Sequence, residues 1–199
     1  MEIRVEDLCK SYSGKPVLAD LNMVLLQGNS YCLMAPSGYG KTTLLHIMMG
    51  LETPDSGVIT GLEGFKLAPV FQEDRLCENL SASSNIRLTE RSPLSSKQIE
   101  ECLEALGLSG CQHKPVREFS GGMKRRVAIA RALLSKGDVL IMDEPFRGLD
   151  LACKEQVMDY VRETVEEKTL IWVTHDEEES KRMDGQLIYL ENISSRRIT

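Results

Sequence analysis

Short apolar runs recur along the chain and predict a sheet whose strands are mostly parallel. The runs fall at residues 2–6, 17–26, 30–34, 58–60, 66–71, 138–142, 169–174 and 186–190. Two of them, in "DVLIMDEP" and "TLIWVTHD", lack the polar alternation of a half-exposed strand, as expected of parallel strands that are covered on both faces. Both runs end in acidic or polar residues, and ligands bind beyond such carboxyl ends.

Helical patterns alternate with these strands and predict an α/β fold. They cover residues 41–50, 97–106, 121–135, 151–166 and 176–183. Ahead of the second pattern, Ser95 and Gln98 have the spacing of a capping box, and Gly107 marks its end. Strand signals are missing between Gln72 and Phe119. We therefore expect a small helical lobe, at approximately residues 73–118, inserted into one domain that covers residues 1–199.

The composition narrows the functional class. The 199-residue chain has a formal net charge of -6 and a pI near 5.2, which argues against a protein that binds nucleic acid. The cysteines at positions 9, 32, 77, 102, 111 and 153 form no C-x-x-C pair, so we expect free thiols in a reducing compartment. No apolar run is long enough to span a bilayer. The sequence thus predicts a cytosolic protein.

The stretch "MAPSGYGKTTLLHIMMG", residues 34–50, predicts a phosphate-binding loop between a strand and a helix. In such a loop, backbone N–H groups surround a β-phosphate, a lysine bridges β- and γ-oxygens, and a hydroxyl binds Mg²⁺. Here these roles fall to residues 37–40, Lys41 and Thr42. Ala35 replaces the first glycine of the strict pattern, but Pro36 favours an extended conformation at position 35 that alanine adopts without strain. A glycine-rich turn that only caps a helix is the alternative.

Several polar residues could complete this phosphate site. Asp143 could hold Mg²⁺ through water and Glu144 could polarise an attacking water, unless both are structural acids at a strand end. His175 could contact the γ-phosphate or position the water, or could simply be packed. Gln72 could complete the metal shell. Tyr12 could stack on an adenine ring, or could be an ordinary loop tyrosine.

A second potential anion site lies in "EFSGGMKRRVAIARALL", residues 118–134, where Ser120, Gly121 and Gly122 begin a helix. Unpaired N–H groups and the helix dipole attract anions there. The basic residues that follow suggest nucleic-acid binding at first sight, but the apolar residues of the same helix are expected to point inward. We therefore expect a solvated or partner-facing basic surface, made by Lys124, Arg125, Arg126 and Arg131.

Taken in order, "APSGYGKTT", "FQEDR", "FSGGMKRRVAIARAL", "VLIMDEPFRGLD" and "VTHD" resemble the ATP-binding cassette (ABC) ATPases over nearly the whole chain. The resemblance implies a P-loop NTPase core with a mostly parallel sheet, an N-terminal antiparallel β lobe and an inserted helical lobe. It implies an ATPase that uses ATP and Mg²⁺. Implied nucleotide-binding residues are Tyr12, Ser37, Gly38, Tyr39, Gly40, Lys41, Thr42, Thr43, Ser120, Gly121 and Gly122; implied metal-binding residues are Thr42, Gln72 and Asp143; implied catalytic residues are Glu144, His175 and Gln72.

The resemblance also explains why one chain has two anion sites. In this family the signature, here Ser120 to Met123, caps the γ-phosphate held by the other subunit of a head-to-tail dimer. The implied partners are a second copy or a similar chain, two transmembrane permease subunits and, through them, a solute-binding protein, without nucleic acid. The implied location is the inner face of the cell membrane. Met123 stands where the family most often has glutamine, which removes a polar side-chain contact.

The family includes proteins with different tasks. "FQEDRL" with S-G-G-M and "ARAL" is similar to the ATPases of nitrate-, sulfonate- and taurine-type importers. An exporter or lipoprotein-extracting cassette would share the motifs, and a non-transport soluble ABC ATPase is a further alternative. A small-molecule kinase built on a P-loop would leave the signature and "RGLD" unexplained.

Overall fold

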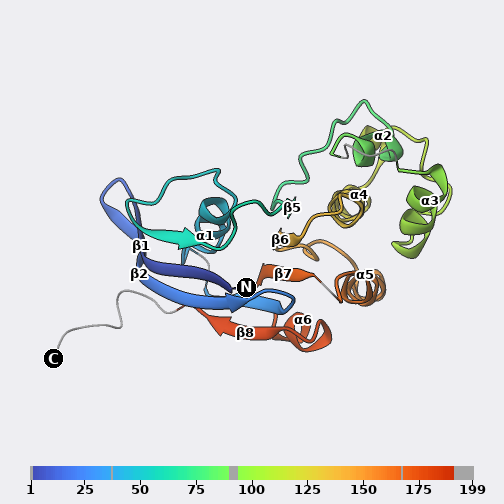
Figure 1. Cartoon of the computed structure of the whole chain (residues 1–199). Helices are drawn as coiled ribbons and strands as arrows, with labels where there is room; N and C mark the ends of the chain where they lie inside the picture. Colours follow the sequence, from blue (N-terminus) through green and yellow to red (C-terminus); the bar gives the residue numbers. More distant parts are fainter. Residues whose placement is uncertain (1, 37, 90–93, 167, 191–199) are drawn as a thin grey trace.

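The computed structural model describes residues 2–36, 38–89, 94–166 and 168–190 (Figure 1). Its strands are β1 (Glu2–Tyr12), β2 (Lys15–Leu26), β3 (Ser30–Met34), β4 (Ser56–Thr60), β5 (Leu67–Val70), β6 (Val139–Asp143), β7 (Thr169–Thr174) and β8 (Gln186–Tyr189). Its helices are α1 (Lys41–Met48), α2 (Ala82–Arg87), α3 (Ser96–Ala105), α4 (Gly121–Leu134), α5 (Leu151–Thr164) and α6 (Glu177–Arg182), with a 3₁₀ turn, η1, at Val116–Glu118. The predicted mixed α/β fold is confirmed.

A parallel sheet of five strands, in the order β5-β6-β7-β3-β8, forms the centre of the molecule. All residues of β6 and β7 are buried, because both faces of the sheet are covered. Alternate side chains of β3 belong to the apolar clusters on opposite faces of the sheet. Leu33 packs in the cluster that contains α1, and Cys32 packs in the cluster that contains residues of α3, α4 and α5. The apolar runs at residues 30–34, 138–142 and 169–174 correspond to the three inner strands of this sheet, β3, β6 and β7.

A second, antiparallel sheet in the order β2-β1-β4 lies at one end of the molecule, and α2 and α3 lie at the opposite end (Figure 1). The predicted strand over residues 2–6 is too short, since β1 continues to Tyr12. Register shifts between Val5 and Leu8 and a positive φ of 47° at Asp7 interrupt the alternation on which the prediction depended.

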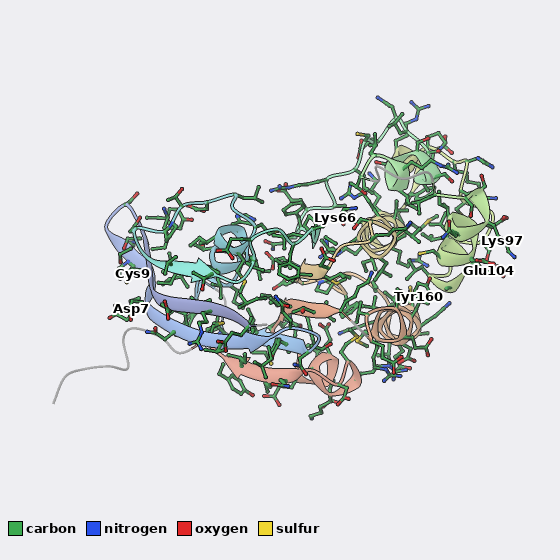
Figure 2. The ribbon with its side chains drawn as sticks, in the orientation of Figure 1. Asp7, Cys9, Lys66, Lys97, Glu104 and Tyr160 are labelled. Carbon is green, nitrogen blue, oxygen red and sulfur yellow. The ribbon has the colours of Figure 1, made fainter. Side chains whose placement is uncertain are left out.

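The helices agree with the predicted patterns apart from α2. The Ser95 side chain accepts from the Gln98 N–H, and the Gln98 side chain accepts from the Ser95 N–H, so the predicted capping box is present. Helix α2 is too short to show a helical period, although its cap, Ser81, is a recognisable start signal. Figure 2 shows Lys97 and Glu104 on the outer side of α3.

No helix of the described ranges is long and apolar enough to cross a membrane. All six cysteines are free, as predicted.

Gly185, between α6 and β8, is required by the largest buried side chain. A Cβ atom at this position would lie 2.0 Å from Cη2 of Trp172, a residue with no exposed surface. We expect Gly185→Ala to lower the free energy of unfolding by about 1–3 kcal/mol, because the core must shift to accommodate the methyl group. Urea unfolding measures this change. Gly121→Ala is the matched control, since a Cβ there meets nothing within 4 Å, and equal stabilities of the two variants would contradict the expectation.

Candidate active site

The loop between β3 and α1 is shaped to receive an anion. Gly38 and Gly40 have left-handed backbone conformations, with φ of 85° and 71°. At Gly40 a side chain is also excluded by space, because a Cβ would lie 2.6 Å from the Val17 carbonyl oxygen. Ala35 is not among the described residues with positive φ, so alanine fits here without strain, as predicted. Ser37 lies outside the described residues.

Lys41, the first residue of α1, reaches back over this loop. Its Nζ donates to the carbonyl oxygens of Ala35 at 2.6 Å and Pro36 at 2.9 Å. The residue is only 9% exposed. The backbone N–H of Tyr39 donates to the Pro36 carbonyl at 3.4 Å, and its side chain packs against the apolar cluster around α1. The lysine charge is therefore held at the loop, where phosphate oxygens could replace the carbonyl partners.

The end of strand β6 meets the start of α1. The Thr42 hydroxyl donates to Oδ2 of Asp143 at 2.6 Å, although the two residues are far apart in sequence. These two oxygens border a cavity of about 290 Å³. The cavity is lined by Val17, Gly38, Gly40, Lys41, Thr42, Thr43, Gln72, Asp143 and Glu144. The structure thus brings the predicted loop, the predicted metal-binding residues and Glu144 together in one place.

The oxygen atoms at this cavity fit Mg²⁺ accompanied by a nucleotide. A hydroxyl and a carboxylate are hard ligands of the kind Mg²⁺ prefers, and Mg²⁺ is usually bound through one or two carboxylates together with substrate phosphates. Among the described residues no group of three or more His, Cys, Asp or Glu could hold a metal ion without such help. Thr42 and Asp143 are therefore suited to share a Mg²⁺ ion with phosphate oxygens.

Burial raises the pKa of Asp143, the nearby Glu144 charge raises it further, and the Thr42 hydrogen bond opposes the shift. The folded protein consequently binds this proton more tightly than the unfolded chain does. Without nucleotide and Mg²⁺, the contribution of Asp143 to stability must therefore fall as the pH rises from the usual aspartate pKa through the raised one.

Asp143→Asn is accordingly expected to stabilise the nucleotide-free protein at pH 7 while impairing its use of Mg²⁺. The amide cannot ionise, so the cost of a buried charge disappears. Thermal unfolding at pH 7 should show a higher midpoint for the variant, and the difference should shrink in acid, where Asp143 of the wild type is protonated. A lower midpoint at pH 7 would contradict this interpretation.

Glu144 follows β6 in a strained conformation and faces His175. Its φ is 45°, a left-handed value that non-glycine residues adopt only where the surroundings enforce it. Its Oε1 lies 3.5 Å from Nδ1 of His175 and its Oε2 lies 3.1 Å from Nη1 of Arg147. The carboxylate side chain is 18% exposed. A second cavity, of about 200 Å³, is lined by both Glu144 and His175, so the glutamate lies between the two cavities.

The loop that carries His175 is fastened to α5. Lys154 of α5 donates to Oδ2 of Asp176 at 2.7 Å and also pairs with the buried Glu179. The bond from Lys154 lowers the pKa of Asp176. At the start of the same helix, the Asp150 side chain accepts from the Cys153 N–H at 3.0 Å and caps α5. The roles of Arg147 and Lys154 could not be predicted from the sequence, because their partners are brought to them by folding and not by a local motif.

Tyr12 lies at the end of β1, 43% exposed. Burial raises its pKa, a hydrogen bond with Glu52 raises it further, and a hydrogen bond with Thr43 lowers it. Nζ of Lys10 is 5.5 Å from the centroid of the tyrosine ring. Because Thr43 lines the 290 Å³ cavity, Tyr12 borders the same region of the molecule.

The second predicted anion site opens elsewhere. Ser120 caps α4, with its Oγ accepting from the Met123 N–H at 3.3 Å. A Cβ at Gly121 would meet nothing within 4 Å, and one at Gly122 would lie 3.4 Å from the Gly148 carbonyl oxygen. None of Ser120, Gly121 and Gly122 is among the described residues that line the 290 Å³ cavity. Within one chain, the two predicted anion sites are therefore separate.

The prediction of a solvated or partner-facing basic surface on α4 is wrong for Arg125. This residue is only 4% exposed, and its guanidinium is enclosed by backbone carbonyls. Arg126 donates to the carbonyls of Leu106 and Gly107, and Arg131 donates to those of Asp74 and Arg75. Lys124 forms an ion pair with Glu78 at 2.6 Å, and Arg125 forms one with Asp74 at 3.3 Å. The sequence did contain an indication that Arg125 is buried, since it shares a helix face with the apolar residues Ile129 and Ala132.

Comparison with known proteins identifies the family. The sequence model of the ABC transporter family matches residues 18–147. The aliphatic sulfonates import ATP-binding protein SsuB 2 of Pseudomonas syringae pv. tomato is 36% identical over 96% of this chain and 82% of its own length. The taurine import ATP-binding protein TauB of Pelagibacter ubique is 37% identical over 91% of this chain and 74% of its own length.

A solved structure shows the same fold. The dimeric post-hydrolysis state of the ATP-binding cassette MJ0796, bound to ADP and Pi, superimposes with a TM-score of 0.84 and 27% identity, covering 95% of this chain and 94% of that one. The resemblance inferred from the motifs is confirmed by the family match and by both relatives. The chain belongs to the ABC transporter family and is an ATPase that uses ATP and Mg²⁺.

Proposed function

We propose that this chain is the ATP-hydrolysing subunit of an importer, in which ATP-driven closure of a dimer and its opening after hydrolysis drive transport through separate membrane subunits. The observation that carries the proposal is the single cavity shared by Lys41, Thr42, Gln72, Asp143 and Glu144. The loop before α1, the end of β6 and the Gln72 side chain provide the phosphate-binding, metal-binding and proton-accepting groups that transfer of a phosphoryl group to water requires.

The proposed chemistry assigns each of these residues a task. Lys41 exchanges its carbonyl partners for the β- and γ-phosphate oxygens, and Thr42 and Asp143 would hold the Mg²⁺ ion. The ion neutralises charge on the transferred group when it is bound. Gln72 completes the metal shell. Glu144 accepts a proton from the attacking water, and a general base of this kind contributes about 10²–10⁴-fold to a rate.

The remaining predicted residues hold the nucleotide. The loop residues Ser37, Gly38, Tyr39, Gly40 and Thr43 surround the phosphates, and Tyr12, beside Thr43, stacks on the adenine. His175, 3.5 Å from Glu144, contacts the γ-phosphate. We also propose that residues 1–199 form one nucleotide-binding domain, with residues 73–118 as its helical subdomain.

The separation of the two predicted anion sites within one chain supports a dimer in which each chain completes the other's site. Ser120, Gly121 and Gly122 do not border the chain's own cavity, so their N–H groups are available to a γ-phosphate held by a second copy. MJ0796 has been solved as a dimer with ADP and Pi. A head-to-tail pair of this chain, or of this chain with a similar one, would contain two composite sites.

The membrane subunits have a candidate docking surface. A cavity of about 270 Å³ lies between β5 and α4. Arg75 stacks over the Phe71 ring at 3.8 Å within it. Its lining residues are Lys66, Leu67, Pro69, Phe71, Arg75, Thr89, Arg131, Ala132 and Ser135. We propose that a permease segment occupies it, which places the chain at the cytoplasmic face of the membrane and, through the permease, near a solute-binding protein.

The proposed cargo is a small sulfonate-, taurine- or nitrate-like solute. The support is the similarity to a sulfonate and a taurine import ATP-binding protein at 36% and 37% identity. The solute binds to the permease and the binding protein, so the residues of this chain do not determine which solute is transported. Export, lipoprotein extraction and non-transport work are the alternatives.

The partner can be identified by capture. Tagged Glu144→Gln protein, which should stall in the closed state, is incubated with ATP and detergent-solubilised membranes of its own source. Recovery of a polytopic permease supports the transporter assignment, and the permease's relatives separate import from export. Recovery of soluble proteins alone would favour a non-transport ATPase. Adding Thr89→Trp, which fills the proposed cleft, should abolish capture, whereas Leu88→Trp, outside that lining, should not.

A further inference from the structure

Arg125 joins α4 to the end of the strand that carries the proposed base. Its Nη2 donates to the carbonyl oxygens of Asp143 at 2.5 Å and Glu144 at 2.6 Å, and its Nε donates to that of Pro145 at 2.9 Å. Three successive carbonyls are therefore held by one side chain. The Glu144 N–H is bound separately, by the Val173 carbonyl at 3.0 Å, so the backbone of Glu144 is fixed from both sides.

The same guanidinium also holds the segment that carries Gln72. Its Nη1 donates to the carbonyl oxygen of Phe71, to that of Gln72 at 3.4 Å and to Oδ1 of Asp74 at 3.3 Å. Arg125 itself is 4% exposed. One buried side chain thus contacts two of the segments that line the 290 Å³ cavity, and it does so from the helix that Ser120 caps.

The geometry suits arginine and no other residue. Arginine carries five donors in a rigid plane, whereas lysine carries three around a single point and cannot serve two separate segments in the same way. The left-handed conformation of Glu144 is strained, and such strain persists only where the surroundings enforce it. The carbonyls that Arg125 holds are those on and around this strained residue.

We propose that Arg125 is a positioning residue for hydrolysis: it keeps the backbone of Glu144 in its strained conformation and aligns the Gln72 segment with it. The proposal rests on the proposed function, which makes Glu144 the base. Arg125 acts through backbone carbonyls and does not itself contact the reacting atoms. Because it sits on α4, a movement of that helix would shift both flanking segments together.

Two other arginines of the same helix provide matched comparisons. Arg126 donates to the carbonyls of Gly122, Leu106 and Gly107. Arg131 reaches the Gln72 side of the cavity, through the carbonyls of Asp74 and Arg75, without reaching β6. Among these three arginines, Arg125 alone contacts the carbonyls of residues 143–145.

The test compares Arg125→Lys with Arg126→Lys in purified protein. Fluorescent ATP-analogue binding, the kcat and KM for ATP, and thermal unfolding are measured for each. We expect Arg125→Lys to keep its nucleotide affinity within about twofold and to lose kcat by about 10²-fold, the size expected of a small misplacement of a catalytic group. Arg126→Lys should keep its kcat.

A double-mutant cycle separates positioning from simple stabilisation. If Arg125 acts through Glu144, adding Arg125→Lys to Glu144→Gln should scarcely lower the remaining single-turnover rate. Wild-type kcat in Arg125→Lys, or additive losses in the double variant, would overturn the inference. It would also be overturned if neither Arg125→Lys nor Arg125→Gln folds while Arg126→Lys does, since the role would then be stability alone. Wild-type hydrolysis by Glu144→Gln would instead refute the proposed base.

Discussion

Glu144→Gln is expected to hydrolyse ATP about 10²–10⁴-fold more slowly than the wild type while binding ATP as well. The amide keeps the shape of the side chain but cannot accept a proton from water. Since the γ-phosphate then stays intact between the two anion sites, ATP-bound dimers should accumulate. Phosphate release measures the rate, and sedimentation measures the dimer.

Glu104→Gln is the control: it changes an acid on the outer side of α3 (Figure 2) that lines neither the 290 Å³ nor the 200 Å³ cavity, and it should leave hydrolysis and sedimentation unchanged. If Glu144→Gln protein with Mg-ATP sediments as a monomer at high concentration, indistinguishable from its ADP form, this result would contradict the dimer mechanism.

Lys41→Ala is expected to impair nucleotide binding, whereas Ser120→Arg is expected to impair turnover. Lys41→Ala removes a charged donor from the phosphates and should weaken nucleotide binding by about 10–100-fold. Ser120→Arg leaves the chain's own cavity untouched and should keep nucleotide affinity. It blocks the site offered to the second copy, however, and should lower turnover by about 10²–10³-fold, as loss of a preorganised donor does.

Equilibrium binding of a fluorescent ATP analogue and steady-state hydrolysis distinguish the two variants. Normal hydrolysis by Ser120→Arg would show that the second anion site takes no part in catalysis. Normal nucleotide affinity in Lys41→Ala would show that the lysine keeps its carbonyl partners, Ala35 and Pro36, when nucleotide binds.

Local patterns were sufficient to predict most of the fold. The continuous apolar runs of β6 and β7 could be recognised because parallel strands buried on two faces need no polar alternation. The end of β1 could not be predicted, since the bend at Asp7 shifts the register. Helix α2 was missed because a helix of one or two turns shows no period.

The candidate site was predictable where a motif fixes local geometry. The loop before α1 and the acids after β6 were recognised from their strand and helix neighbours, and the structure brings Thr42 and Asp143 to 2.6 Å. The functions of these residues stay predictions. The environment of Arg125 was predicted wrongly, because a guanidinium that is satisfied by backbone carbonyls from distant segments resembles a surface charge in the sequence.

The most direct test of the composite site is ATP hydrolysis by mixed protomers. Glu144→Gln and Ser120→Arg proteins are each expected to hydrolyse ATP at least about 10²-fold more slowly than the wild type, but a mixed dimer joins the intact Glu144 of one copy to the intact Ser120 of the other. Mixing the two before ATP is added should therefore restore hydrolysis well above the sum of the separate rates. A rate equal to that sum would contradict an active site built from two copies of this chain.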